Sequence, residues 1–322
     1  MGLPPRSCPS TEAWLTRLAP DSAAVTRSAA HGAELLREVV LLGAVWGASV
    51  MLQRLAVAEV QPLPLVALRL LAAVVVFVPF AGRVGRAVAA RPHLLVHFCL
   101  IGALNPVLSG LFTALALQRA SSGLVAVLQT LSPIWTAALA HLVLREEAPG
   151  RRSLAGLAVA LSGVVLLLLT AGSGVGAGPA TDVGGLLLAM GAPLAAALGS
   201  IYVRQHLSGT PALVAAGGQI TAACLLALPV SIIAGQQPVL TEISGRAWLA
   251  IVLSGAIGLS ASFVLFVHMI GRRGPTAALL ATYVMPVVAA VLGVLVLGET
   301  ITPPMLAGSA LVLVGVVVFT QG

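Results

Sequence analysis

The chain of 322 residues is 59% hydrophobic and only 8% charged, and its formal net charge is +7. A soluble domain of this length normally carries about a quarter charged residues, so the composition excludes an ordinary soluble protein and favours a lipid-embedded one. All seventeen basic residues are arginines, and they lie between apolar runs, which is typical of membrane topology signals and not of a nucleic-acid-binding face. The three cysteines show no metal or disulfide spacing.

The predicted elements begin with an N-terminal tail. Residues 1–33 contain polar residues and several prolines but no long apolar core, so we expect a cytoplasmic, disordered tail, with a short surface helix around Trp14 as the alternative. From residue 36 onward, apolar runs recur that are long enough to cross a hydrocarbon core of about 30 Å, and the connections are too short for a soluble domain. The predicted spans are residues 36–56, 62–81, 93–117, 121–143, 153–171, 183–203, 211–234, 247–270, 275–297 and 304–321.

The positions of the arginines predict how the spans are oriented. With a cytoplasmic N-terminus, thirteen arginines fall on the cytoplasmic side, three fall on the outer side, and Arg69 lies inside a span. Because cytoplasmic connections are enriched in arginine, this bias places both termini in the cytoplasm and requires an even number of spans. We therefore expect a multi-pass protein of the cell membrane with ten transmembrane helices.

The sequence also repeats within itself at a shift of 152 to 153 residues. The matched pairs include Gly102 with Gly255, Pro133 with Pro286, Glu146 with Glu299, Gly156 with Gly308 and Gly163 with Gly315. Because each half holds an odd number of helices, the second half must enter the membrane upside down, and the arginines exchange sides between equivalent connections accordingly. The sequence predicts an all-α protein of two inverted five-helix repeats, residues 34–172 and 182–321, which is a construction of secondary transporters.

The arrangement resembles the EamA-type members of the drug/metabolite transporter superfamily over residues 36–321. The resemblance is carried by Trp46-Gly47-Ala48-Ser49, by Leu68-Arg69-Leu70, and by the stretch from Ala126 through Gln129, Ser132, Pro133 and Leu144 to Glu146 with its echo from Ala278 through Pro286 and Leu297 to Glu299. It implies ten helices, a central cavity between the halves, and movement of small metabolites or drugs, usually outward. It leaves the substrate open.

Polar and aromatic side chains inside the spans are the candidates for lining that cavity. A polar side chain is costly in hydrocarbon unless it faces the helix bundle or a wet cavity, although small and hydroxylated residues also serve only to let helices approach closely. For Trp46, a flat wall for substrate and simple packing are both open. The candidate substrate-binding residues are Trp46, Asn105, Ser109, Gln129, Thr136, Ser262, Thr282 and Tyr283.

Two prolines and two ionisable residues complete the set of candidates. Pro133 and Pro286 free backbone carbonyls in equivalent helices and would act as hinges or substrate contacts, with a structural kink as the alternative. Arg69 and His268 are candidates for a charge or proton role, against outward snorkelling or helix pairing for the arginine and a structural role for the histidine. The helix-end carboxylates Glu146 and Glu299 are expected to cap or bridge neighbouring helices.

The leading prediction is an alternating-access secondary transporter that exports small metabolites, amino-acid-like compounds or drugs. A lipid or lipid-linked carrier flippase of the same fold is the alternative. An enzyme is not expected, because the sequence shows no clustered carboxylates, nucleophile–base pair or phosphate-binding loop. The expected partners are the lipid bilayer and a small-molecule substrate. No nucleic acid, cofactor or metal is expected, a homodimer is left open, and proton coupling and facilitated passage both stay open because no acidic residue lies at mid-membrane.

Overall fold

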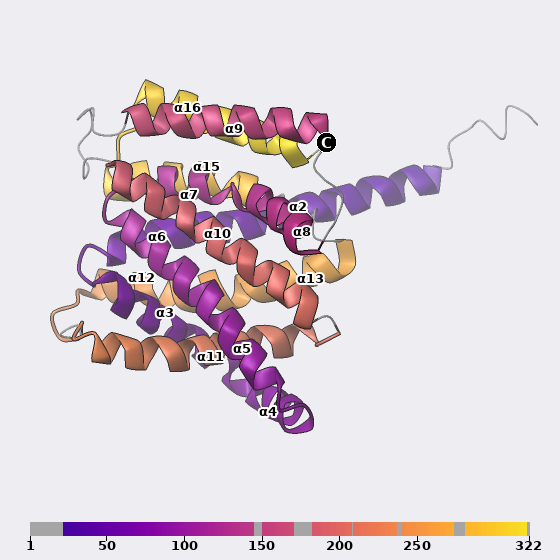
Figure 1. Ribbon diagram of the computed structural model, residues 1–322, viewed down its shortest axis with the longest axis vertical. Coiled ribbons are helices and arrows are strands. Elements are labelled where there is room, and N and C mark those ends of the chain that lie inside the picture. The colour runs from indigo at the N-terminus through magenta and orange to yellow at the C-terminus, as the bar shows by residue number, and fades with distance from the viewer. Residues whose placement is uncertain are drawn as a thin grey trace, which may run out of the picture.

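The computed structural model of the chain describes residues 22–144, 150–170, 182–207, 209–236, 240–273 and 281–320. In these ranges every regular element is a helix, and most helices run roughly along one common direction (Figure 1). Three sequence expectations lie outside the described residues: the first part of the tail, the bridging role of Glu146, and the beginning of the predicted ninth span.

The helices of the first half follow the predicted spans, with three additions. Helix α2 begins at Ser22, inside the predicted tail, because residues 22–36 are rich in alanine and other good helix formers. The second span continues through a 3-10 turn, η1, into α4, and the third span contains a π-helix, η2. The bounds are α2 (Ser22–Ala56), α3 (Pro62–Phe77), η1 (Val78–Phe80), α4 (Ala81–Ala90), α5 (Leu94–Gly102), η2 (Ala103–Leu108), α6 (Ser109–Leu117), α7 (Ser122–Gln129), α8 (Ser132–Leu144) and α9 (Arg151–Thr170).

The helices of the second half repeat this series. Its third span is again split by a π-helix, η3. The bounds are α10 (Val183–His206), α11 (Ala212–Ile233), α12 (Gly245–Gly255), η3 (Ala256–Ala261), α13 (Ser262–Arg273), α15 (Ala281–Leu297) and α16 (Pro303–Thr320). Eight helical segments of the described chain are long and apolar enough to cross a membrane. Two further helices, α9 and the shorter apolar α15, take the places of the predicted fifth and ninth spans.

The two helices that end the halves, α9 and α16, show directly that the halves are inverted. They lie side by side along one edge of the molecule (Figure 1). A Cβ on Gly163 would lie 2.7 Å from the Gly308 carbonyl oxygen, and a Cβ on Gly156 would lie 2.7 Å from the Gly315 carbonyl oxygen. The lower-numbered glycine of one helix meets the higher-numbered glycine of the other, so these equivalent helices are antiparallel. The predicted inverted architecture is confirmed.

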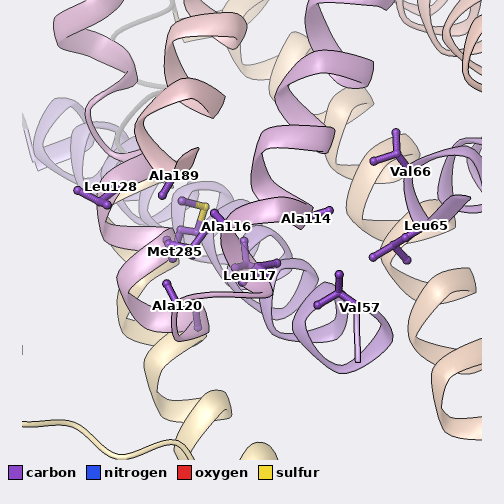
Figure 2. Close-up of a cluster of buried hydrophobic side chains, with 14 of the residues drawn as sticks. Val57, Leu65, Val66, Ala114, Ala116, Leu117, Ala120, Leu128, Ala189 and Met285 are labelled. Carbon is purple, nitrogen blue, oxygen red and sulfur yellow. The ribbon is translucent and has the colours of Figure 1, made fainter. Parts of the chain in front are cut away.

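Other helix contacts also join one half to the other in equivalent pairs. Helix α2 packs on α15, and its counterpart α10 packs on α7 and α8; α10 also packs on α6, and α2 packs on α12. The main core joins both halves and contains Leu65, Leu117, Leu128, Ala189 and Met285 (Figure 2). The side where α2 begins and α16 ends is called the terminal face below, and the opposite side is called the far face.

The glycine contacts between α9 and α16 generate a stability prediction. A Cβ on Gly315 would lie 2.6 Å from the Ala160 Cα and 2.6 Å from the Gly156 carbonyl oxygen, so Gly315→Ala must push two backbones apart. We expect the free energy of unfolding to fall by about 1–3 kcal/mol, as for other overpacked sites. Thermal unfolding in detergent measures it.

The matched control is Gly85→Ala on α4, where a Cβ would meet nothing within 4 Å. Because alanine is the better helix former, this control is expected to raise the free energy of unfolding by about 0.5–1 kcal/mol. Equal effects of the two substitutions would contradict the close packing of α9 on α16.

Candidate functional site

Two breaks in helical geometry lie at equivalent positions of the two halves. The π-helices η2 (Ala103–Leu108) and η3 (Ala256–Ala261) begin 153 residues apart, which is the shift of the sequence repeat. Within η2, Asn105 has φ −146° and ψ 107°, outside the helical region, and Pro106 follows it without a backbone donor. Such breaks free backbone carbonyls at membrane depth and are frequent at functional sites. The Asn105–Pro106 pair was the sequence signal for this break, and the sequence analysis overlooked it.

Each break is held by a polar side chain from the neighbouring second span of the other half. The Gln219 side-chain amide, on α11, donates a hydrogen bond to the Asn105 carbonyl. On the opposite half, Arg69 on α3 donates to the hydroxyl and the carbonyl of Ser254 at 2.9 and 3.3 Å, just before η3. Arg69 and Gln219 therefore have equivalent roles.

Glycines at the contact points let the helices that carry these side chains approach closely. A Cβ on Gly102 would lie 2.9 Å from the Gln219 carbonyl oxygen, and a Cβ on the equivalent Gly255 would clash with the Arg69 carbonyl oxygen. The absent side chains let α3 and α11 approach the broken spans closely, as is typical of packing between membrane helices. These two glycines explain part of the sequence repeat.

Arg69 lies at the centre of a buried polar cluster. Its side chain is 4% exposed, and besides Ser254 it donates to the Gln53 side-chain oxygen at 2.6 Å and to the Ser49 hydroxyl at 3.4 Å. In the described part of the chain, no carboxylate lies within ion-pairing distance of the guanidinium. Outward snorkelling, one of the alternatives for this residue, is therefore excluded, and Arg69 joins α2 and α3 of the first half to α12 of the second.

Two of the predicted cavity residues, Ser109 and Gln129, belong to another polar chain, between α6 and α7. The Thr113 hydroxyl donates to the Ser109 carbonyl at 2.9 Å, and the Gln129 amide donates to the Thr113 hydroxyl at 3.4 Å. Ser109 and Gln129 are partly buried, as is Asn105 one turn before Ser109. The structure thus links Ser109 to Gln129 through Thr113, and Asn105 precedes Ser109 on the same span.

The predicted residues of the second half are more dispersed. The Ser262 hydroxyl donates to the Gly258 carbonyl of its own helical segment at 2.6 Å, so its polar group is already used inside the helix. The Tyr283 hydroxyl lies 2.8 Å from the Thr320 hydroxyl near the end of α16. Thr282 is buried, and His268 is exposed on α13. The structure does not unite these residues in one cluster.

Two tryptophans contribute an aromatic contact and a buried hydrogen-bond donor. The partly buried Trp46 ring lies 5.4 Å from the Phe266 ring, centroid to centroid, which joins α2 to α13. In the described residues, the indole N–H of Trp135 is a buried donor without an acceptor. Trp135 precedes the partly buried Thr136 on α8. Because nearly all buried donors in proteins are paired, this N–H is a candidate ligand contact that the sequence analysis missed.

The two equivalent prolines have different surroundings. Helix α7 ends at Gln129, α8 begins at Ser132, and Pro133 stands in the first turn of α8. Pro286 is instead buried inside the uninterrupted helix α15. The expected helix break is therefore present at Pro133, where the chain can restart a helix at no cost to its hydrogen bonds, and absent at Pro286.

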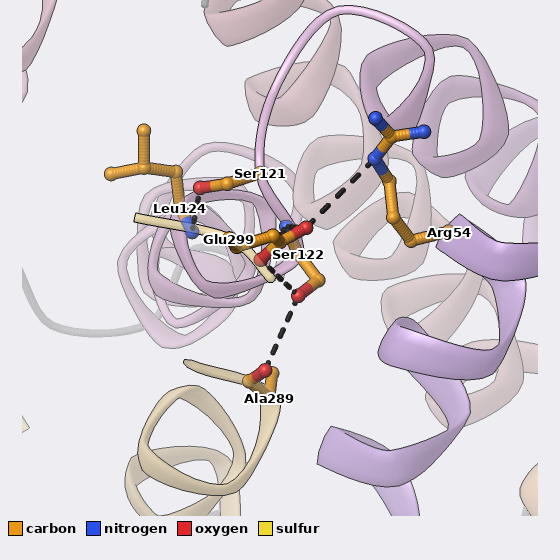
Figure 3. Close-up of polar contacts among 6 residues, drawn as sticks. All are labelled: Arg54, Ser121, Ser122, Leu124, Ala289 and Glu299. Carbon is orange, nitrogen blue, oxygen red and sulfur yellow. Dashed lines mark hydrogen bonds and ion pairs between the residues drawn. The ribbon is translucent and has the colours of Figure 1, made fainter. Parts of the chain in front are cut away.

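At the far face, Glu299 bridges helices from both halves, as expected for a helix-end carboxylate. It accepts hydrogen bonds from the Ser122 amide at 2.9 and 3.1 Å and from the Ser122 hydroxyl at 2.7 Å, and it lies 3.9 Å from the Arg54 guanidinium (Figure 3). The bridge joins the ends of α2 and α15 to the start of α7. Because its hydrogen bonds are charge-assisted, they are stronger than neutral ones.

Two further carboxylates tie the halves together at this face. Glu59 accepts hydrogen bonds from the Ser244 amide and hydroxyl, both at 2.8 Å, and Asp182 lies 4.0 Å from the Arg119 guanidinium. The Ser244 amide first and its hydroxyl second lower the pKa of the Glu59 carboxyl below its ordinary value. Glu59, Asp182 and Glu299 each connect one half to the other, so carboxylate contacts join the halves at the far face.

The inverted helical halves with paired mid-span breaks define a multi-pass membrane protein of the transporter type. The model of the EamA-like transporter family matches residues 38–169 and 183–321. The chain belongs to this family.

Individual relatives agree with the family assignment. The chain is 27% identical over 281 residues to the uncharacterized inner membrane transporter YedA of Escherichia coli K12, covering 86% of this chain and 88% of that protein. It is 25% identical to a chloroplastic WAT1-related protein of Arabidopsis thaliana, covering 84% and 66% of the two chains. One crystal structure is similar in fold, with a TM-score of 0.61, 21% identity and coverage of 88% and 96%.

The Arg69 cluster generates a stability prediction. Arg69→Ala leaves the Gln53 side-chain oxygen and the Ser254 carbonyl without their donor in a buried place. We expect the free energy of unfolding to fall by about 1–3 kcal/mol for the unpaired groups, measured by thermal unfolding in detergent. Arg86→Ala on the exposed face of α4 is the control and is expected to change it by less than about 0.5 kcal/mol. An unchanged melting temperature for Arg69→Ala would contradict the role of the cluster.

The Glu59 contact generates a pH prediction. Because its folded-state pKa is lowered, the contact stabilises the protein above the unfolded carboxyl pKa of about 4.3 and is lost as the pH falls through the lower folded value. Melting temperatures of the parent and Glu59→Gln should therefore differ at neutral pH and converge on acidification below about pH 4. Glu242→Gln, an exposed carboxylate in the connection between α11 and α12 that also contains Ser244, is the control. A difference that is constant with pH would refute the assignment.

Proposed function

We propose that this protein is an alternating-access secondary transporter that exports small metabolites, amino-acid-like compounds or drugs across the cell membrane, with both chain termini in the cytoplasm. The observation that carries the proposal is the pair of mid-span breaks, η2 and η3, at equivalent positions of two inverted halves. Discontinuous helices at the interface of inverted repeats form the substrate sites of many secondary transporters, and one half rocks against the other around them.

The polar region around η2 is the proposed substrate site. Asn105 and Gln129 supply amide groups, Ser109 and Thr136 lie beside them on the same spans, and the unpaired Trp135 N–H supplies a buried donor. Donors of this kind suit a carboxylate or carbonyl oxygen of a small amphipathic molecule. The aromatic rings of Trp46 and Tyr283 supply flat apolar surfaces on the neighbouring α2 and α15.

Arg69 and Gln219 are proposed as positioning residues. Both donate to groups at the broken spans, and Arg69 is enclosed by its own partners. In this role their hydrogen bonds stabilise the irregular segments inside the hydrocarbon, where an unpaired carbonyl is costly. In this proposal, the far-face contacts of Glu59, Asp182 and Glu299 keep the outer side shut, and outward release of the substrate requires them to part.

The test starts from comparative metabolite profiling of cells with and without the gene, inside the cells and in the medium. Compounds that differ are then used with the protein in liposomes, where we expect saturable flux and counterflow. Flux without saturation or counterflow would refute alternating access. Activity on headgroup-labelled lipids and none on soluble metabolites would identify a flippase instead.

Site variants give the matching prediction. Gln129→Ala and Tyr283→Ala are expected to lower flux by about two- to tenfold, the effect of losing one hydrogen bond, without loss of expression. The control is Ser162→Ala on α9, whose exposed hydroxyl bonds only within its own helix at 2.7 Å. Unchanged kinetics of the first two variants would remove these residues from the site.

A further inference from the structure

Three histidines and a tyrosine gather at the terminal face, away from the proposed substrate site. His93 and His97 stand at the start of α5, and Tyr202 and His206 stand at the end of α10, each pair one helical turn apart. The His97 Nδ1 lies 2.8 Å from the Tyr202 hydroxyl. The His97 ring centroid lies 5.8 Å from that of His93 and 5.1 Å from that of His206, and the His206 ring stacks on Tyr202 at 4.3 Å.

This histidine–tyrosine cluster joins the two halves of the molecule, because α5 belongs to the first half and α10 to the second. It occupies the face opposite the carboxylate contacts of Glu59, Asp182 and Glu299. Carboxylates ordinarily titrate near pH 4 and imidazoles near pH 6.5. Imidazoles as a class change charge between about pH 5 and 8, whereas carboxylates as a class stay ionised there, so the two faces differ in the kind of group that joins the halves.

The helices packed around the cluster carry several arginines and one further histidine. Arg83 and Arg86 belong to α4, Arg91 follows α4, Arg204 belongs to α10, and His141 lies on α8. The other titratable groups on α5 and α11 are the thiols Cys99 and Cys224. The sequences of α4, α5, α8, α10 and α11 contain no aspartate or glutamate. A proton added to the cluster is therefore not compensated by a carboxylate on these helices, and neighbouring imidazolium groups repel one another.

Protonation also alters the hydrogen bonds within the cluster. A neutral imidazole can accept a hydrogen bond from the Tyr202 hydroxyl through Nδ1, whereas an imidazolium can only donate. The His206 Nδ1 donates to the Tyr202 backbone carbonyl at 3.2 Å, which keeps its ring on the tyrosine. Charge on His97 and His206 together therefore opposes the contact between α5 and α10.

We propose that this cluster is a proton-operated latch between the halves: neutral imidazoles hold α5 against α10, and protonation releases this contact so that the terminal face can open. The inference rests on the proposed alternating-access function and adds a regulation to it. Acidification on the terminal side would favour the conformation open to that side, because the far-face carboxylate contacts lie on the opposite side of the membrane.

The test measures the opening of the terminal face directly. Spin labels are placed on exposed residues Gly85 of α4 and Gln205 of α10, in a chain whose native cysteines are replaced by alanine. In lipid nanodiscs without substrate, we expect the distance between the labels to lengthen on acidification from pH 8 to 5.5, with a midpoint between these two values. No lengthening would overturn the proposal.

Variants separate the latch from general effects of pH. His97→Gln combined with His206→Gln should abolish the lengthening, and His141→Gln, an exposed histidine on α8, should retain it. The same lengthening in the double variant would overturn the proposal. Tyr202→Phe, which keeps the ring stacked on His206 but loses the hydroxyl, should move the midpoint to higher pH, and an unmoved midpoint would count against the latch.

A measurement on the unsubstituted protein guards against misfolded variants. Histidine-selective NMR should show cluster imidazoles that titrate in coupled, separate steps, whereas independent single-step titrations would contradict the proposal. The label distances need no substrate. Lengthening without any flux would therefore refute the transporter proposal alone, and saturable flux without lengthening would refute only the latch.

Discussion

The architecture depends on one constraint: in hydrocarbon, every polar group must find its partner inside the protein. The third and eighth spans depart from α-helical geometry at η2 and η3, and the second and seventh spans supply polar partners in η2 or just before η3. Gln219 bonds to the Asn105 carbonyl, and Arg69 bonds to Ser254. The glycines at positions 102 and 255 allow that contact by removing the side chains that would separate the helices. A break that alone would be costly becomes a fixed, paired feature of both halves.

The two membrane faces are held by different chemistry although the halves are equivalent. Carboxylates join the halves at the far face, through Glu299 above all, whereas aromatic and imidazole rings around His97 join them at the terminal face. An inverted repeat imposes the same backbone on both faces, so only side chains can make them differ. The proposed latch depends on that difference, since carboxylates and imidazoles are protonated in different pH ranges.

The sequence predicts the helices well and the polar contacts only in part. Apolar runs located the spans to within a few residues, but the helical start of α2 and the restart of a helix beside Pro133 depend on local propensity that hydropathy does not measure. Among the polar residues, Ser109 and Gln129 are linked through Thr113. The hydroxyl of Ser262 is used within its own helix, and His268 is exposed, because spacing alone does not reveal which direction a side chain faces.

The sequence by itself determined that the chain crosses a membrane repeatedly and that its halves are inverted, because span length, arginine bias and a constant repeat shift are properties of the chain alone. The tertiary structure decided which polar groups meet. Arg69 and Ser254 are 185 residues apart, and His97 and Tyr202 are 105 residues apart. Such pairs arise only when two inverted halves pack, so no local pattern marks them. For that reason the buried arginine had several predicted roles and the histidine–tyrosine cluster had none.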